Sequence, residues 1–263
     1  MKSMEIAIIG TGRFGYFWGK ELSKYFPIFA YDTKIERRSQ VEQFARWCPL
    51  EECLKKEVVV LTIPIREMPA FLAQYGDRFL PGSLVMDCAS VKMVVTQWFE
   101  QYLPEDVDYL PTHPLFGPDS AADGIEGHTL TIIPGRLSSE RLQFFKNFFS
   151  NTLKLKLLTI SPEEHDRLMA FNLSLMHHLG RALSELGIEQ LPLQMASLKR
   201  ALQISQVAMN DTRELFEDFY LFNPYADLVR GQFLEAFQAV GVEANQNLLE
   251  KAAPLSGEFI KVP

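Results

Sequence analysis

The sequence predicts an α/β protein: a doubly wound sheet followed by an all-α C-terminal domain. Short apolar runs alternate with helix-period segments over about the first 160 residues, which is typical of βαβ units. One run, Val58–Ile63, is apolar or β-branched throughout, as expected of a strand buried on both faces of a parallel sheet. After Ser161 we find no convincing strand, only long amphipathic segments. The predicted domains are therefore residues 1–160 and 161–263.

The predicted strands of the first domain are its short apolar runs: Glu5–Ile9, Ile28–Tyr31, Val58–Ile63, Ser83–Asp87, Val107–Leu110, Thr129–Ile133 and Lys154–Thr159. The predicted helices are the segments between them that carry apolar residues at helical spacing: Arg13–Tyr25, Lys34–Trp47, Met68–Phe79, Lys92–Tyr102 and Ser138–Phe149.

The helical domain begins with a recognisable start. Ser161 can cap a helix, Pro162 suits the first helical position, and Glu164 can reach back to the cap. The helices predicted from there on are His165–Leu186, Leu193–Met209, Thr212–Phe222 and Tyr225–Lys251.

Composition excludes some classes of protein. The chain has 263 residues, a formal net charge of −7 and a pI near 5.4, which argues against nucleic-acid binding because that needs lysine and arginine to neutralise phosphates. No apolar run approaches the roughly 18 to 20 residues of a membrane span, and the N-terminal residues do not resemble a signal peptide. Cys48, Cys53 and Cys88 form no Cys-x-x-Cys pair and do not group with histidines. We therefore expect reduced thiols, a cytoplasmic protein and no metal.

The first motif is Gly10-Thr11-Gly12-Arg13-Phe14-Gly15, which follows a predicted strand and opens a predicted helix. In a Rossmann-type domain the first glycine permits the turn, the second lets the backbone approach a pyrophosphate, and the third lets the helix pack closely. Free N–H groups at the helix start then hold the phosphates. Asp32 ends the next strand, where an acid binds the ribose hydroxyls. We predict a cofactor site made of residues 10–15, Asp32 and Pro64, which closes the Val58–Ile63 run.

The predicted cofactor is NAD, because the Asp32 carboxylate would repel the 2′-phosphate of NADP. Lys34, Arg37 and Arg38 lie just beyond and could favour NADP instead, or form a solvated helix face. The alternative for the whole motif is an ordinary turn with glycines at its bends.

Two polar tracts follow later strands: Asp87-Cys88-Ala89-Ser90-Val91-Lys92 and Pro111-Thr112-His113-Pro114-Leu115-Phe116-Gly117-Pro118-Asp119. Dinucleotide sites lie outside the carboxyl ends of parallel strands, so these residues are candidates for chemistry. His113, in a predicted loop between prolines, is a candidate general acid or base, or else a loop histidine bonded to backbone. Asp87 and Ser90 can equally be structural caps.

The same tracts resemble the prephenate dehydrogenase family, which includes arogenate dehydrogenases. The resemblance rests on the glycine loop, Asp87-x-x-Ser90-Val91-Lys92, His113-Pro114-Leu115-Phe116-Gly117-Pro118 and His165-Asp166, and it covers nearly the whole chain. Met169-Ala170-Phe171 and Leu215-Phe216-Glu217-Asp218 resemble the dehydrogenase half of bifunctional chorismate mutase–prephenate dehydrogenases. Because the glycine loop begins at residue 10, we expect a monofunctional enzyme.

The resemblance implies NAD-dependent oxidative decarboxylation of prephenate to 4-hydroxyphenylpyruvate in tyrosine biosynthesis. It implies that His113 takes the proton of the ring hydroxyl and that Ser90 orients both the imidazole and that hydroxyl. Lys92 would support the loop or the local charge. The alternative substrate is arogenate, which differs only by an amino in place of a keto group and would yield tyrosine.

For the helical half, the resemblance implies substrate binding and dimerisation. The family tract Ser-His-Leu-Pro-His here reads Leu173-Ser174-Leu175-Met176-His177, so only the second histidine, His177, is retained as a candidate substrate contact or a packing residue. Many members have an arginine where this chain has Glu217, so another cation must bind the substrate carboxylates. The basic residues that could do so are Lys199, Arg200, Arg213 and Arg230, of which we name Arg200 and Arg213.

Apolar residues on more than one side of the predicted helices favour a homodimer through this half.

Two other interpretations of the function stay open. β-Hydroxyacid dehydrogenases and pyrroline-5-carboxylate reductases share the architecture, but the hydroxyacid enzymes use a helical-domain lysine tract that is not seen after residue 160. The second alternative function is a non-catalytic sensor of a dinucleotide or an aromatic ligand, although a sensor has no need of a general base.

Overall fold

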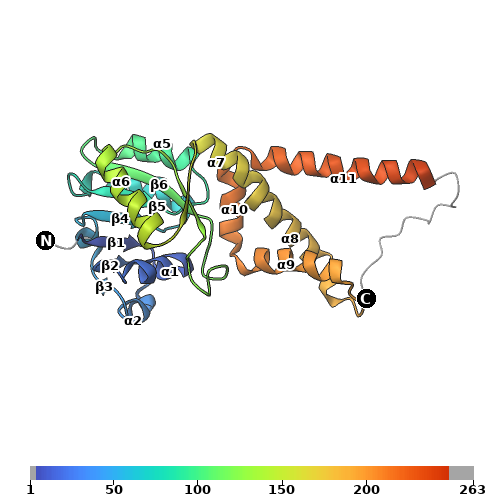
Figure 1. Ribbon diagram of the computed structural model, residues 1–263, viewed down its shortest axis with the longest axis horizontal. Helices are drawn as coiled ribbons and strands as arrows, with labels where there is room; N and C mark the ends of the chain where they lie inside the picture. Colours follow the sequence, from blue (N-terminus) through green and yellow to red (C-terminus); the bar gives the residue numbers. More distant parts are fainter. Residues whose placement is uncertain (1–3, 249–263) are drawn as a thin grey trace. The chain divides into compact units, whose positions relative to one another are not determined.

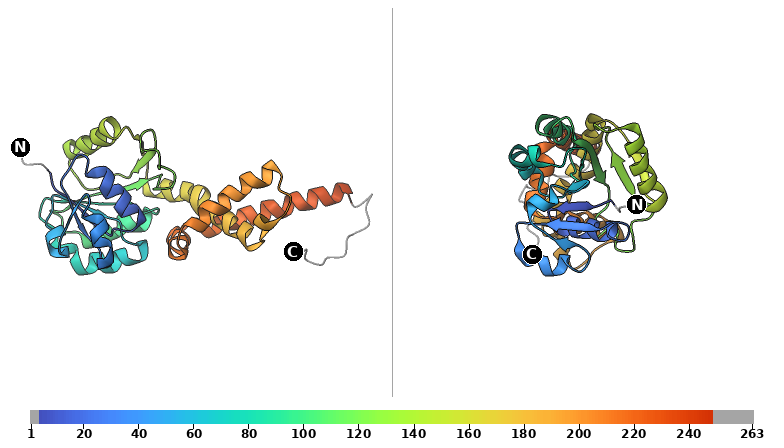
Figure 2. Two further views of the ribbon diagram at one scale, coloured as in Figure 1. Left: turned by 90° about the horizontal axis from the view of Figure 1, so that it is seen from below. Right: turned by 90° about the vertical axis from the view of Figure 1, so that its left-hand side faces the viewer.

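The structure is a computed structural model that describes residues 4–248, with side chains to residue 241. The chain divides into two compact units, one ending at His165 and one beginning at Asp166, inside helix α7 (Pro162–Met169). Figure 1 and Figure 2 draw the first unit in blue to green and the second in yellow to red.

The first unit contains a sheet whose described strands follow the order β3-β2-β1-β4-β5-β6-β7-β8. Neighbouring strands are parallel, except that β6 and β7 are antiparallel. This confirms the predicted doubly wound α/β sheet. The bounds are β1 (Ile6–Ile9), β2 (Ile28–Tyr31), β3 (Arg46–Trp47), β4 (Val58–Leu61), β5 (Leu84–Asp87), β6 (Asp108–Pro114), β7 (Thr129–Ile132) and β8 (Lys156–Thr159).

Both faces of this sheet are buried. Helices α1 (Arg13–Leu22) and α6 (Ser139–Asn147) pack on one set of alternating strand residues, and the cluster they form includes Trp18, Phe145, Ile8 and Val60. Side chains alternate along a strand, so Ala7 and Val59 point to the opposite face, and both are fully buried. Burial on both faces explains why these strands read as continuous apolar runs. The remaining helices of this unit are α2 (Arg38–Val41), α3 (Leu50–Cys53), α4 (Met68–Tyr75) and α5 (Met93–Tyr102).

The predicted helix Lys34–Trp47 is wrong over its second half. Its first half forms a 3₁₀ turn at Ile35–Arg37 and the short helix α2, but its second half leaves the helix and ends in strand β3, which pairs with β2. Val41 and Ala45 are both buried, and their spacing gave the helical pattern. Pairing with the edge of β2, which no local pattern encodes, makes the final residues a strand.

The predicted strand Val107–Leu110 runs on to Pro114, so His113 lies in strand β6 and the prediction of a loop there is wrong. Beyond Pro111 the strand leaves its parallel partner β5 and pairs antiparallel with β7, with His113 opposite Thr131. Prolines on both sides of His113 suggested a loop, but they are tolerated where a strand changes partners.

The second unit is helical, as predicted. After α7, π-helical turns at Ala170–Leu175 lead directly into α8 (Met176–Glu185), and α9 (Ala196–Asn210), α10 (Arg213–Phe222) and α11 (Ala226–Leu248) follow. The predicted cap of α7 is confirmed, because the Glu164 N–H donates to Ser161 Oγ at 3.1 Å. The predicted helix end at Lys251 lies outside the described residues.

Helices α8 and α9 approach closely at Gly180. A Cβ atom at this position would lie 2.6 Å from Ala208 Cβ and 2.7 Å from the Ile204 carbonyl oxygen. Only glycine therefore allows the two backbones to meet at this distance.

Within residues 4–248, no helix combines the length and the apolar character needed to cross a membrane. Nor do three or more histidine, cysteine or acidic residues of that range come together in a way that could hold a metal ion. The three cysteines are free thiols, and the buried pair Cys48 and Cys53 has its Sγ atoms 2.9 Å apart.

Candidate functional site

The candidate residues of the first unit follow the carboxyl ends of adjacent strands. Gly10 follows β1, Asp32 follows β2, Pro64 closely follows β4, Ser90 closely follows β5, and His113 lies in the last part of β6. The strands stand in the order β2-β1-β4-β5-β6, so these positions share one edge of the sheet. This edge is where doubly wound α/β proteins bind ligands.

The glycine loop is shaped for a close approach to a ligand at one position and for packing at the other two. Gly10 has a φ of 95°, and a Cβ on Gly15 would lie 2.0 Å from the Gly10 carbonyl oxygen, so both positions require glycine. A Cβ on Gly12 would meet nothing nearer than Arg37 Nη1 at 3.9 Å. Helix α1 starts there with no side-chain cap and no acidic residue in its first turn. Its first N–H groups are therefore available to an anion.

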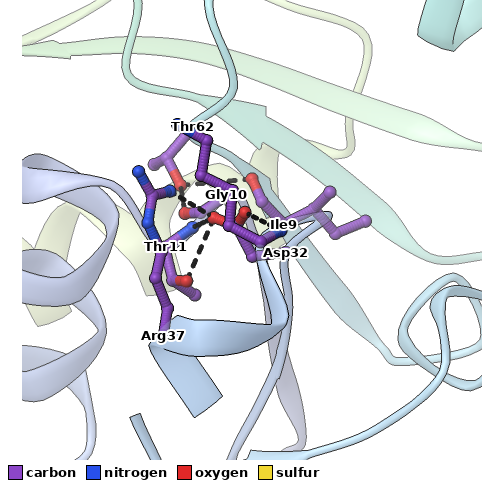
Figure 3. A network of polar contacts seen from close by, with 7 residues as sticks. Ile9, Gly10, Thr11, Asp32, Arg37 and Thr62 are labelled. Atoms are coloured by element: carbon purple, nitrogen blue, oxygen red, sulfur yellow. Dashed lines mark hydrogen bonds and ion pairs between the residues drawn. The ribbon is translucent and has the colours of Figure 1, made fainter. Parts of the chain in front are cut away.

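Asp32 lies at the centre of a network beside this loop (Figure 3). Its carboxylate accepts hydrogen bonds from the Thr11 N–H at 2.6 Å, the Thr11 hydroxyl at 3.1 Å, the Lys34 N–H at 2.8 Å and Arg37 Nη1 at 2.6 Å. Burial acts to raise the pKa of Asp32, but the backbone donors of Lys34 and Thr11, together with Arg37, outweigh it and lower the pKa. The carboxylate is thus charged and already paired with a guanidinium.

The side chains of three other predicted cofactor residues are paired, packed or exposed rather than joined to this network. Arg13 forms a two-pronged ion pair with Asp119, at 2.6 and 2.8 Å, and both side chains are more than half exposed. Phe14 packs its ring near Trp18 at the margin of the core. Pro64 is exposed and precedes a 3₁₀ turn after β4. With the side chains in these positions, the groups that Arg13 and Phe14 offer to a dinucleotide are their backbone N–H groups at the start of α1.

A buried ion pair organises the segment after β5. Lys92 Nζ donates to the Asp87 carboxylate, and both side chains are fully buried. The same carboxylate accepts from the Ala89 N–H at 2.8 Å and the Thr112 N–H at 3.3 Å, which ties the end of β5 to β6. Burial raises the pKa of Asp87, and Lys92 acts against that rise. Asp87 is thus the structural anchor of this segment.

Ser90 lies within this anchored segment. Its side-chain oxygen is buried and has no hydrogen-bond partner among residues 4–248, so it makes no bond to His113 there. A buried hydroxyl without a partner is uncommon in folded proteins and marks a position to be explained.

His113 instead pairs with a second histidine. Its Nδ1 lies 2.9 Å from Nε2 of His165, which comes from the first turn of α7 and is fully buried. Burial, and then the charges of His165 and Lys92, hold the pKa of His113 well below its ordinary value. His113 is therefore a neutral imidazole near neutral pH, as a general base must be.

In the second unit, the structure brings together two of the three predicted substrate residues. His177 and Arg200 both line a cavity of about 340 Å³, whose other lining residues come from the π-helical turns, α8 and α9. Burial lowers the pKa of His177 to about 4, helped by Arg181 and His178, so its 3.4 Å contact with Asp211 is not an ion pair near neutral pH. Arg213 does not line this cavity. Its side chain is 84% exposed and pairs with Glu217 at 3.0 Å.

Sequence reasoning missed three features of the site: the partnership of His113 with His165, the pairing of Arg37 with Asp32, and the full burial of Lys92. His165 belongs to a tract singled out in the sequence, but 52 residues separate it from His113. Arg37 stands five residues from Asp32, so its pairing could have been proposed from spacing alone.

Comparison with known proteins finds two matching family models. A model described as prephenate dehydrogenase, nucleotide-binding domain, matches residues 30–153. A model described as TYRAAT1-like, C-terminal domain, matches residues 182–253. Together they cover parts of both units.

Individual relatives are similar over most of the chain. Arogenate dehydrogenase 2, chloroplastic, of Arabidopsis thaliana is 28% identical over 238 residues, which is 85% of this chain and 65% of the plant protein. The chain thus spans slightly less than two thirds of that relative. Prephenate dehydrogenase of Aquifex aeolicus, solved with hydroxyphenyl propionate and NAD+, has a TM-score of 0.76 at 19% identity over 95% of each chain. Synechocystis arogenate dehydrogenase has a TM-score of 0.69 at 17% identity over 94% of each chain.

Proposed function

The chain belongs to the prephenate and arogenate dehydrogenase family, and from this premise we propose that it is a NAD-dependent prephenate dehydrogenase of tyrosine biosynthesis. In this proposal it converts prephenate to 4-hydroxyphenylpyruvate by oxidative decarboxylation. The family makes the chain an oxidoreductase, and the cofactor, the substrate and the role of each residue are what we propose.

The proposed cofactor site consists of residues 10–15, Asp32 and Pro64. Three observations support it: the open space beside Gly12, the uncapped start of α1, and the carboxylate of Asp32 next to the loop. Backbone N–H groups at the start of α1 would bind the pyrophosphate, and Asp32 would bind the adenosine ribose. When bound, NAD supplies the hydride acceptor of the reaction.

The observation that carries the proposal is the neutral His113 at the carboxyl edge of the sheet, with the buried hydroxyl of Ser90 after the adjacent strand β5. A dehydrogenase of this kind must accept the hydroxyl proton while the carbon that bears the hydroxyl gives up hydride. We assign that step to His113. Ser90 provides a hydroxyl that can hydrogen-bond to the substrate oxygen.

The proton and electron balance fits a base that returns its proton. As hydride leaves, the O–H proton moves to His113 Nε2. The bond between the ring and its carboxylate then breaks, carbon dioxide leaves, and its electron pair makes the ring aromatic. The phenolate oxygen takes the proton back, so His113 ends neutral and no net proton is released.

For the substrate carboxylates and side chain we propose Arg200 and His177, because they line one cavity of the helical unit. Arg213 remains a weaker candidate, because its guanidinium is already paired with Glu217. Arogenate is the second candidate substrate, and the observation in its favour is the extensive similarity to a plant arogenate dehydrogenase.

The decisive experiment supplies the full chain with prephenate or arogenate, each with NAD or NADP, and follows the absorbance of the reduced nicotinamide. We expect the highest kcat/KM with prephenate and NAD. A higher kcat/KM with arogenate would make the second candidate the substrate, and absence of turnover with both would overturn the proposal. A β-hydroxyacid serves as the substrate of the competing enzyme class.

We further propose that the chain is a homodimer through its helical unit. Large apolar side chains of α10 and α11 are well exposed, among them Leu221, Leu228, Phe237 and Val240. Exposed apolar surface of this extent is typical of an interaction face. Sedimentation at micromolar concentration should show a dimer that Phe237→Glu weakens, whereas a 30.1 kDa species of the unchanged chain would contradict the proposal.

A further inference from the structure

His113 and His165 form a pair whose geometry restricts what each ring can do. The nitrogens His113 Nδ1 and His165 Nε2 are 2.9 Å apart, and the two rings meet edge to face at 68° with centroids 5.1 Å apart. Strand β6 holds one ring and the first turn of α7 holds the other. Both elements are regular, so the pair is built into the fold of the first unit.

Only one hydrogen atom can lie between the two nitrogens, so the bond exists in two forms. In the first, His113 Nδ1–H donates to His165 Nε2, and His113 Nε2 carries a lone pair. In the second, His165 Nε2–H donates to His113 Nδ1, and His113 must carry its hydrogen on Nε2. A ring in the second form can donate to a substrate hydroxyl but cannot take its proton.

The surroundings of the pair favour a neutral His113 ring. Lys92 acts on His113 from the segment after β5, and His165 acts on it from α7. Lys92 is itself paired with the fully buried Asp87. On α7, Asp166 follows His165 directly and is also fully buried, while the nearby Glu164 and Glu163 are exposed. A positive charge on His113 is therefore opposed by Lys92 and by any charge on the neighbouring imidazole.

We propose that His165 is a positioning residue for catalysis: by accepting the Nδ1–H of His113 it fixes the tautomer that leaves His113 Nε2 free to take the substrate proton. The inference rests on the proposed dehydrogenase function and adds to it a residue with a defined task. His165 acts through His113 and needs no contact with the substrate. An orienting partner behind a general base is a recurrent arrangement in enzymes.

The test compares His165→Leu, which removes the acceptor, with His165→Gln, whose side-chain carbonyl can still accept from Nδ1–H. We expect the leucine variant to lose more than about tenfold in kcat, and the glutamine variant to retain more activity than the leucine variant. KM and NAD binding should stay within about threefold in both variants, since the proposed role gives His165 no contact with the substrate or with NAD. His128→Leu is the matched control, a histidine of the same unit whose ring lies tilted against Phe116, with centroids 5.2 Å apart.

The pH profile separates positioning from packing. At low pH a proton taken up by His165 opposes protonation of His113 and so lowers its pKa, and removing the ring should therefore move the acid limb of kcat/KM to higher pH in both variants. A leucine variant with kcat within about threefold of the unchanged chain, or variants whose acid limb does not move, would overturn the inference.

A measurement on the unchanged full chain guards against variants that do not fold. Long-range proton–nitrogen NMR correlations assign the hydrogen of each imidazole, and we expect His113 to carry its hydrogen on Nδ1. A hydrogen on Nε2 would refute the proposed role. This readout does not depend on turnover, so it distinguishes failure of the pairing from failure of the proposed function.

Discussion

Replacing Lys92 by methionine should destabilise the first unit by about 3 kcal/mol. Lys92 and Asp87 form an ion pair in which both side chains are fully buried, so water cannot replace the lost cation. Methionine is flexible and of comparable length, so it removes the charge while leaving little empty space. The variant therefore isolates the cost of leaving Asp87 without its cation.

The magnitude follows from what Asp87 retains. Removing one partner of a buried ion pair costs about 3 to 5 kcal/mol, because the other charge is left uncompensated. Here the N–H groups of Ala89 and Thr112 still donate to the carboxylate, at 2.8 and 3.3 Å. The carboxyl group can also take up a proton. Both effects limit the loss, so we expect the lower end of the range.

The same reasoning gives the variant a pH dependence of known sign. Burial raises the pKa of Asp87, and loss of the opposing Lys92 raises it further. The folded variant then holds a proton that the unfolded chain releases above its ordinary pKa of 3.8. Its stability relative to the unchanged chain should therefore fall as the pH rises above that value.

Urea unfolding at several pH values measures both effects. The control is the double variant Asp87→Asn with Lys92→Met, which removes both charges and keeps an acceptor for the Ala89 N–H. We expect it to recover all but about 1 kcal/mol. A single variant that loses less than about 1 kcal/mol, or a double variant no more stable than the single one, would refute the reasoning.

Three further predictions concern the proposed cofactor and catalysis. Gly12→Ala should keep the thermal stability of the unchanged chain but bind NAD at least about tenfold more weakly. Gly15→Ala should lower Tm, because its Cβ would meet a backbone oxygen at 2.0 Å. Equal Tm values for the two variants would contradict this prediction. Arg37→Ala should lower kcat/KM with NADP about tenfold more than with NAD, because Arg37 offsets the charge of the Asp32 carboxylate. Arg38→Ala is the control. An equal loss of kcat/KM with both cofactors would argue against that role. His113→Asn should reduce kcat by about 10² to 10⁴ while NAD binding is preserved. The unchanged enzyme should keep its kcat/KM as the pH falls through about 6.5, the ordinary histidine pKa, and lose it only at the lower pKa of His113. A kcat within about threefold for that variant, or a limb near the ordinary histidine pKa, would show that His113 is not the base.

The sheet of the first unit could be predicted because its information is local. Val58–Ile63 reads as a buried parallel strand from composition alone, and the structure places β4 at Val58–Leu61. The glycine loop likewise follows from residues that are neighbours in sequence. The start of α7 was predicted for the same reason, since Ser161 and Glu164 lie within one turn.

Features that depend on partners far along the chain could not be predicted in the same way. Strand β3 exists because Arg46 and Trp47 pair with β2, although the local spacing favours a helix. His113 belongs to a strand because β7 pairs with it, although two prolines flank it. Its bond to His165 joins residues that share no pattern in sequence.

Charged residues were the hardest to place. Lys92 was expected to support its loop, but nothing in sequence distinguishes a fully buried lysine from an exposed one. Arg200 and Arg213 are equivalent in sequence, yet Arg200 lines a cavity while Arg213 pairs with a residue one turn along its own helix. Which face of a helix a cation occupies depends on how the helices pack.

The pairing of strand β6 determines how far the proposed base can move during the reaction. Its first residues are held by β5 and its last by β7, so the backbone that carries His113 is bonded into the sheet without a flexible connection. A base on such a strand undergoes little reorganisation when a substrate arrives, and its alignment is already part of the free energy of folding. Motions that admit substrate or release product must then arise elsewhere in the chain, while the proton acceptor stays fixed through every turnover.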